Sequence, residues 1–235
     1  MSLLNKIISV IIPAYNEEKR IVNTLLAVKG ISQIQNILVM DDGSKDHTFL
    51  KASSVQGIEV VRKEVNEGKG KALYEGIERV IEDADIIVFA DADLEESAKD
   101  IEKLIIPIIE DVADVTIAKF PSAKKKGGFG LVKKLAKTGV YINTGRQLDT
   151  VLSGQRAFKK EVIQHINHGY TGYGVELGMT IDILNNGYRI QEVEVNMHHN
   201  ETGRDLSGFI HRGRQFFQIL RVLIKKTIVT TLKKR

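Results

Sequence analysis

The sequence lacks cysteine altogether and has only three prolines in 235 residues. The absence of cysteine excludes disulfide bonds and thiolate chemistry, and it is compatible with a reducing compartment. No proline-rich linker divides the chain. No apolar run reaches the roughly 18 residues that a membrane-spanning helix needs. Because the first residues also lack the pattern of a signal peptide, we expect a cytoplasmic protein.

Acidic residues are scarce in two segments of the chain. Residues 119–137 contain seven lysines and no acid, and residues 204–235 contain nine Lys or Arg and one Asp. Since the formal net charge of the whole chain is only +4, the remainder is acidic. An acidic body with two basic segments differs from the broadly basic surface of a nucleic-acid-binding protein, so we expect no nucleic-acid partner.

Apolar runs of strand length alternate with helical patterns in the first half of the chain. Strands are predicted at 7–12, 36–40, 58–61, 86–90 and 113–118, and helices at 17–29, 72–81 and 97–110. This alternation predicts an α/β fold with three layers (αβα) and a mostly parallel central sheet. Polar loops follow three of these strands, and they should lie along the edge where open α/β folds bind ligands.

The alternation breaks after Lys119. Residues 124–130 are rich in lysine and glycine and are expected to form a loop, and a strand is expected within 149–158. Further predicted elements are helices at 131–145 and 172–185, a strand at 188–195 and a helix at 209–232.

The last predicted helix is amphipathic and basic, so we divide the chain into a domain, residues 1–205, and a helical tail, residues 206–235. The tail could cover the sheet domain, mediate a homodimer, or lie on an anionic membrane surface.

Two carboxylates, Asp91 and Asp93, follow the apolar run 86–90. Side chains at i and i+2 of an extended chain point the same way, and converging carboxylates repel unless a cation lies between them. A divalent metal that holds a phosphorylated ligand meets this need, although an ordinary acidic loop shows the same pattern. Residues 66–71, with two glycines and two lysines before a helix, offer N–H groups and cations to a phosphate, or form a capped turn.

Four loops taken together resemble the nucleotide-sugar half of a family 2 glycosyltransferase with the GT-A fold. They are Pro13-Ala14-Tyr15-Asn16-Glu17, Asp41-Asp42-Gly43-Ser44, Asn66-Glu67-Gly68-Lys69-Gly70 and Asp91-Ala92-Asp93. The resemblance divides the domain into a nucleotide-sugar half, residues 1–95, and an acceptor half, residues 96–205. Residues 153–158 are similar to a segment of the dolichyl-phosphate mannose synthase branch, and residues 172–176 and 198–200 resemble the glucosyl-3-phosphoglycerate synthase branch.

The resemblance implies a binding site for a nucleoside-diphosphate-sugar of the UDP or GDP type. The implied donor-binding residues are Pro13, Ala14, Tyr15, Glu17, Asp42, Lys69 and Asp91. Asp42 would face the base, Lys69 would lie near the diphosphate, and Asp91 would contact the ribose or a metal-bound water. Asp93 and His198, which is a better match than the neighbouring His199, would hold Mg²⁺ or Mn²⁺. These metals accept oxygen ligands, and the histidine favours Mn²⁺.

The implied acceptor is a small phosphorylated molecule or a polyprenyl phosphate, beside Gly128, Gly130 and Arg156. If the anomeric centre inverts, an acceptor hydroxyl needs a general base, and Glu176 and Asp149 are the candidates. Glu176 could equally be an acid stabilised by the dipole of its helix, and Asp149 could cap a turn. Arg156 could also be an ordinary charge at the edge of a strand.

Two other functions fit parts of the pattern. A nucleotidyltransferase shares the architecture and the acidic metal site, but it has a glycine-rich, arginine-containing loop after the first strand, where this chain has residues 13–17. A non-catalytic nucleotide-sugar-binding module would not need Lys69, Asp91 and Asp93. We therefore expect a hexosyltransferase, which would lie on the inner face of the membrane if its tail binds lipid.

Overall fold

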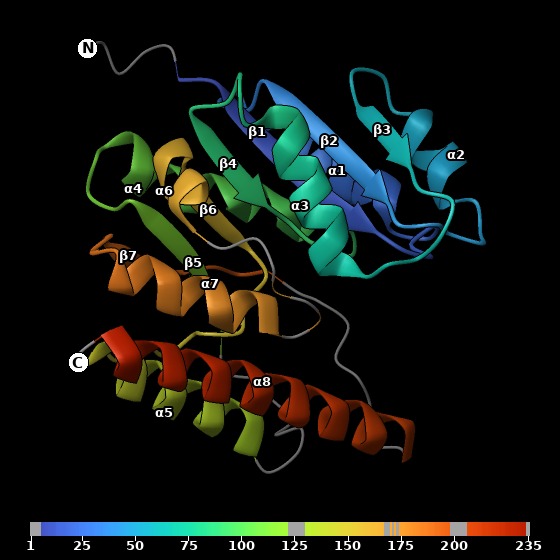
Figure 1. Cartoon of the computed structure of the whole chain (residues 1–235). Coiled ribbons are helices and arrows are strands. Elements are labelled where there is room, and N and C mark those ends of the chain that lie inside the picture. The colour runs from blue at the N-terminus through green and yellow to red at the C-terminus, as the bar shows by residue number, and fades with distance from the viewer. Residues whose placement is uncertain are drawn as a thin grey trace.

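A computed structural model gives the architecture around one central sheet (Figure 1). It describes residues 6–121, 130–166, 170, 172, 174–197 and 206–233, with the backbone alone for 206–212, 214 and 228–233. Within these residues the sheet has seven strands in the order β3-β2-β1-β4-β6-β5-β7. The strands are β1 (Ile8–Ala14), β2 (Asn36–Asp41), β3 (Glu59–Arg62), β4 (Ile86–Phe89), β5 (Val115–Lys119), β6 (Arg156–Lys159) and β7 (Ile190–Glu194).

The sheet is mostly parallel, as predicted. β6 alone among these strands runs antiparallel to its neighbours, β4 and β5. Every residue of β4 is buried, as are six of the seven residues of β1. Strands covered on both faces need apolar side chains throughout, which explains why these two appear in the sequence as continuous apolar runs.

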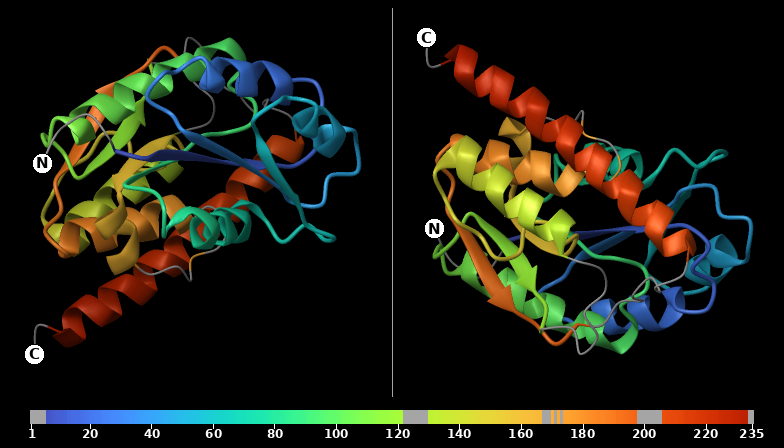
Figure 2. Two further views of the ribbon diagram at one scale, coloured as in Figure 1. Left: turned by 90° about the horizontal axis from the view of Figure 1, so that it is seen from above. Right: turned by 90° about the horizontal axis from the view of Figure 1, so that it is seen from below.

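Helices cover both faces of the sheet, which confirms the predicted three layers (Figures 1 and 2). They are α1 (Ile21–Lys29), α2 (Thr48–Ser53), α3 (Lys69–Val80), α4 (Ile101–Ile109), α5 (Leu131–Thr144), α6 (Lys160–His165), α7 (Gly174–Asn185) and α8 (Leu206–Lys233), with a 3₁₀ helix at Glu95–Asp100. One apolar core lies between the sheet and helices α1 and α4, and a second lies between the sheet and helices α3, α6 and α7.

Many predicted ends shift by one to three residues, and three differences from the prediction are larger. The helix expected at 17–29 begins at Ile21, because Asn16 has a left-handed φ of 56° and Glu17 to Arg20 form a turn. The helix expected at 97–110 divides into a 3₁₀ helix and α4. The short helices α2 and α6 were not predicted, since six residues are too few to show a helical period.

Close packing of α3 against β1 places the start of α3 at the carboxyl edge of the sheet. A Cβ at Gly76 would lie 2.6 Å from Ile11 Cγ2 and 3.2 Å from Met40 Cγ. Such overlap in a packed core is destabilising, so the glycine allows the close approach. The first residue of α3, Lys69, thereby reaches the edge where β1, β2 and β4 end.

Helices α5 and α8 form an additional layer over α7 (Figures 1 and 2). Ile219 and Leu223 of α8 are buried in a third core with residues of α5 and α7. A side chain at Gly139 of α5 would overlap Leu223, so this glycine lets the two helices lie close together. These contacts agree with the first of the three roles considered for the tail, covering the domain, and they do not test the other two.

No helix among the described residues is long and apolar enough to cross a bilayer.

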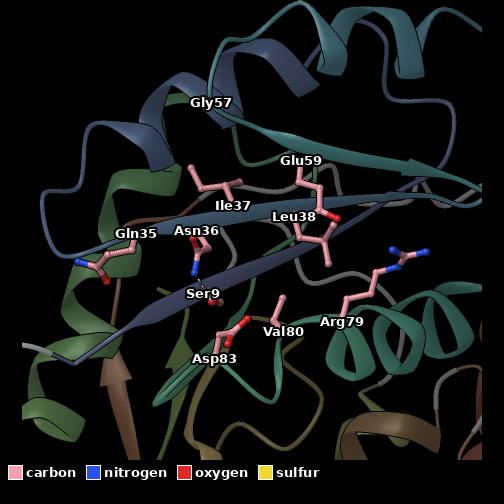
Figure 3. A pocket seen from close by; sticks show the side chains of 10 residues that line it. All are labelled: Ser9, Gln35, Asn36, Ile37, Leu38, Gly57, Glu59, Arg79, Val80 and Asp83. Atoms are coloured by element: carbon pink, nitrogen blue, oxygen red, sulfur yellow. Dashed lines mark hydrogen bonds between the residues drawn. The ribbon is translucent and has the colours of Figure 1, made fainter.

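A pocket of about 210 Å³ lies at the amino ends of β1, β2 and β3 (Figure 3). Its polar lining includes Asn36, which donates a hydrogen bond to Ser9 Oγ at 3.2 Å, and the side chains of Arg79 and Asp83. The loops predicted to bind the donor follow the opposite ends of the strands. This pocket is therefore separate from the candidate site.

Candidate functional site

The loops that follow β1 and β2 are joined by hydrogen bonds into one rim. The N–H of Asn16 donates to Ser44 Oγ at 3.0 Å, and Asn16 Oδ1 accepts from the N–H of Lys45 at 2.9 Å. The N–H of Glu17 donates to Thr48 Oγ1 at 2.7 Å. The parallel strands end at the same edge, and these bonds hold the two predicted donor loops together there.

Asp42 connects this rim to the loop that leads into α3. Its carboxylate, 2% exposed, accepts hydrogen bonds from the N–H groups of Glu67 at 3.0 Å and Gly68 at 2.7 Å. Lys63 Nζ lies 3.3 Å from the same carboxylate. Asp42 therefore helps to fix the loop that presents Lys69, and its predicted contact with a nucleotide base stays a prediction.

Lys69 lies between two carboxylates that come from distant parts of the chain. Its Nζ is 2.5 Å from Asp91 Oδ1 and 3.9 Å from Glu176 Oε1. Burial alone would lower the pKa of the Lys69 ammonium, but the charges of Asp91 and Glu176 outweigh burial and raise it above its usual value. The side chain is 38% exposed, so the ammonium can be reached by a ligand at this edge although it is paired with these carboxylates.

Asp93 and Glu17 add negative charge to the same edge. Burial raises the pKa of Glu17, its bond with Arg20 lowers it in part, and the charge of Asp93 raises it further. Asp93 also contributes to the raised pKa of Lys69, so it lies within electrostatic reach of both. Mg²⁺ and Mn²⁺ accept carboxylate oxygens as ligands, so the carboxylates at this edge suit such a metal.

The described residues contain no group of three or more His, Cys, Asp or Glu side chains that could hold a metal by themselves. Mg²⁺ is commonly held by one or two carboxylates together with substrate phosphates, and Asp93 fits that pattern. The other predicted ligand, His198, and the predicted acceptor residue Gly128 lie outside the described residues.

The two candidate bases have different surroundings. Glu176, in the first turn of α7, has a side chain that is 15% exposed and faces Lys69. Asp149 is 64% exposed and pairs with Lys137 Nζ at 2.9 Å and Lys119 Nζ at 3.7 Å. The hydrogen bond from Lys137, with the charges of both lysines, holds the pKa of Asp149 below its usual value. Asp149 is therefore a weaker proton acceptor than an isolated carboxylate.

Arg156 is buried, which disagrees with the prediction that it contacts an acceptor. The residue is 1% exposed and donates to the carbonyls of Ser153 at 2.8 Å and Val151 at 2.6 Å, and to Thr180 Oγ1 at 2.9 Å. Burial lowers the pKa of Arg156 to about 10, which leaves it charged at neutral pH. Arg156 thus ties the turn before β6 to α7 instead of facing solvent.

Three more predicted donor residues lie at the end of β1 or directly after it, and the predicted acceptor residue Gly130 precedes α5. Ala14 is buried, and its carbonyl accepts a hydrogen bond from the N–H of Asp42 at 2.9 Å. Pro13 precedes it at the end of β1, and Tyr15 is 41% exposed. Gly130 has a φ of 66° directly before α5. Gln155 is not among the predicted site residues, because nothing near it in the sequence marks its partner; its Nε2 donates to Asp91 Oδ2.

Comparisons with known proteins agree with this geometry. The model of the family "Glycosyl transferase family 2" matches residues 9–171. An uncharacterized protein of Methanocaldococcus jannaschii is 32% identical over 94% of this chain and 92% of its own length. The UDP-N-acetylglucosamine–dolichyl-phosphate N-acetylglucosaminyltransferase of Methanococcus voltae is 33% identical over 69% of this chain and 73% of its own.

Glucosyl-3-phosphoglycerate synthase of Mycobacterium tuberculosis, solved with Mn²⁺, UDP-glucose and phosphoglyceric acid, has the same fold. The TM-score is 0.78 at 25% identity, over 94% of this chain and 80% of that chain.

Proposed function

This chain belongs to glycosyl transferase family 2, and we propose that it transfers a sugar from a UDP-sugar to a polyprenyl phosphate with the help of a divalent metal. Membership of the family makes it a glycosyltransferase and argues against a nucleotidyltransferase. The observation that carries the donor proposal is the position of Lys69. Its ammonium lies at the ligand edge of the sheet, between Asp91 and Glu176 and within electrostatic reach of Asp93.

The departure of a nucleoside diphosphate from the sugar requires positive charge beside the diphosphate, where Lys69 would lie. Breaking the bond between sugar and phosphate leaves a nucleoside diphosphate, and Lys69 would stabilise its developing negative charge. Asp93, with His198, would hold the metal, which when bound supplies Lewis-acid stabilisation of the same charge. One relative is named for its use of UDP-N-acetylglucosamine, and another was solved with UDP-glucose. These two relatives support UDP rather than GDP as the nucleotide of the donor.

The surface of α5 and α8 favours a lipid-linked acceptor over a small soluble one. Neither helix contains an Asp or Glu. Both helices expose large apolar side chains, which are Tyr141 (52% exposed), Ile142 (63%), Phe217 (70%) and Ile224 (55%). Exposed cations on the same helices are Lys133, Lys134, Arg221 and Lys225. Apolar side chains mixed with cations suit the interface of an anionic membrane, where a polyprenyl phosphate would be found.

The nature of the acceptor decides whether a general base is needed. A phosphate oxygen is already anionic near neutral pH, so it can attack without losing a proton. Glu176 would then serve as an electrostatic partner of Lys69. A phosphoglycerate-type acceptor, as in the solved relative, would attack through a hydroxyl, and an inverting enzyme would then need Glu176 as a base.

The donor site can be tested by thermal shift with UDP, GDP, UDP-glucose and UDP-N-acetylglucosamine, each with and without Mn²⁺. We expect UDP and its sugars to raise the melting temperature only when Mn²⁺ is present. Asp93→Ala should abolish this shift, whereas Asp83→Ala, an exposed aspartate at the opposite end of the strands, should keep it. Metal-dependent stabilisation that survives in Asp93→Ala, or that no nucleotide produces in the unaltered chain, would contradict the proposal.

The acceptor surface can be tested by flotation with vesicles of anionic and of neutral lipid. The chain should float with anionic vesicles, and Phe217→Asp should remove that binding. Leu50→Asp, at a side chain on α2 that is 62% exposed, is the matched control and should bind unchanged. Absence of binding in the unaltered chain would contradict the membrane proposal. Sedimentation that shows a homodimer disrupted by Phe217→Asp would assign the surface to subunit contact instead.

A further inference from the structure

A short turn before β6, residues Ser153 to Gln155, lies directly against Lys69 and Asp91. Ser153 and Gln155 are 8% and 2% exposed. The Ser153 hydroxyl donates to Gln155 Oε1 at 3.3 Å, which directs Nε2 of the same amide toward Asp91. Asp91 is therefore held on one oxygen by Gln155 and on the other by Lys69.

Gly154 leaves the space that the Lys69 ammonium occupies. A Cβ built on Gly154 would overlap Lys69 Nζ and would lie 3.4 Å and 3.5 Å from the two carboxylate oxygens of Asp91. Gly154 is absent from the glycines with positive φ, so its backbone does not require glycine. The missing side chain serves the packing of Lys69, not the shape of the turn.

The turn itself is fixed by Arg156. Its buried guanidinium donates to two carbonyls of residues 151–153 and to Thr180 on α7. The turn therefore cannot move away from Lys69 without breaking hydrogen bonds inside the protein. A larger side chain at position 154 would instead displace the end of Lys69, which is the more flexible of the two groups.

We propose that Gly154 and Gln155 are positioning residues, which hold the Lys69 ammonium and the Asp91 carboxylate where the donor diphosphate arrives. This inference rests on the proposed function, because it assumes that Lys69 receives the diphosphate. Gln155 holds the Asp91 carboxylate in place. Asp91 and the space left free by the missing side chain of Gly154 hold the Lys69 ammonium. Arg156 fixes the turn that carries Gly154 and Gln155.

The test compares Gly154→Ala, Lys69→Ala and the double variant by calorimetric titration with UDP in the presence of Mn²⁺. Loss of one hydrogen bond from a charged group corresponds to about a tenfold weaker affinity. We expect Gly154→Ala and Lys69→Ala each to weaken UDP binding by about that factor or more. Because both act through the same ammonium, the double variant should bind no more weakly than Lys69→Ala alone.

Two controls separate positioning from general damage. Gly30→Ala, at a glycine with a φ of −71° at the end of α1, should bind UDP like the unaltered chain. The melting temperature of Gly154→Ala should stay within about 2 °C, since a flexible lysine end can give way. Gln155→Met, which keeps the length of the side chain and removes the amide donor, should also weaken UDP binding while it stays folded.

The outcomes distinguish the two proposals. If Lys69→Ala binds UDP like the unaltered chain, the proposed role of Lys69 fails. If Lys69→Ala weakens binding while Gly154→Ala does not, or if the two losses add fully in the double variant, only the positioning role fails.

Discussion

Replacement of Arg156 by methionine should destabilise the protein by about 3 kcal/mol. The guanidinium is 1% exposed and donates three hydrogen bonds, to Val151, Ser153 and Thr180. Methionine fills a similar volume but leaves three acceptors without this donor, at about 1–3 kcal/mol each. Burial lowers the pKa of Arg156 to about 10, which means that the buried charge destabilises the folded protein by about 3 kcal/mol. Methionine removes this destabilisation. The midpoint of these opposing terms is a net loss of about 3 kcal/mol.

Urea unfolding followed by circular dichroism measures this loss directly, and for a chain of this size it corresponds to about 6–12 °C in melting temperature. Arg79→Met, at an exposed arginine of α3, is the matched control and should stay within about 0.5 kcal/mol. Arg156→Lys should fall between the two, because it keeps the charge and loses the planar fork of donors. Arg156→Met with a stability equal to that of Arg79→Met would refute the reasoning.

Two further predictions concern carboxylates. Hydrogen bonds from Arg189 and Lys159 hold the pKa of Asp114 well below its usual value. Asp114→Asn should therefore cost about 2 kcal/mol above about pH 4. The cost should shrink as the pH falls further, because the aspartate of the unfolded chain then binds a proton that the folded protein does not, which lowers the stability of the unaltered chain. A urea-unfolding difference that is equal at pH 7 and pH 3 would contradict this. With a polyprenyl-phosphate acceptor, Glu176→Gln and Asp149→Asn should each lower kcat by less than about tenfold. A fall in kcat of about a hundredfold in Glu176→Gln alone would instead identify Glu176 as a general base.

The meeting of the predicted polar loops at one edge of the sheet could be predicted from the sequence, because it follows from topology. β1, β2 and β4 are buried apolar runs, and parallel strands joined by helices bring the loops at their carboxyl ends to one edge. The polar residues in those loops therefore had to meet, whatever the details of packing. The hydrogen bonds of Asn16 and Asp42 show that they do.

The second half of the site could not be predicted in the same way, because its residues depend on partners far away in the chain. Arg156 looks like a surface charge until the carbonyls of the turn surround it. Glu176 had no cation near it in sequence, yet Lys69 lies 3.9 Å away once α3 and α7 pack on the same face of the sheet. The tail showed an apolar stripe, but its partner could not be named until the structure placed Leu223 against Gly139 and the apolar residues of α5.

The balance of charge at the edge explains why donor and metal should bind together. Lys69 is already compensated by Asp91 and Glu176, Glu17 is paired with Arg20, and Asp93 adds further negative charge nearby. A diphosphate that approached this edge alone would meet mainly carboxylates, and like charges at short range raise the free energy of the bound state. A divalent cation bound together with the diphosphate would offset this repulsion, and Asp93 would help to hold it. By thermodynamic linkage, UDP should then strengthen the binding of the metal by the same factor by which the metal strengthens the binding of UDP.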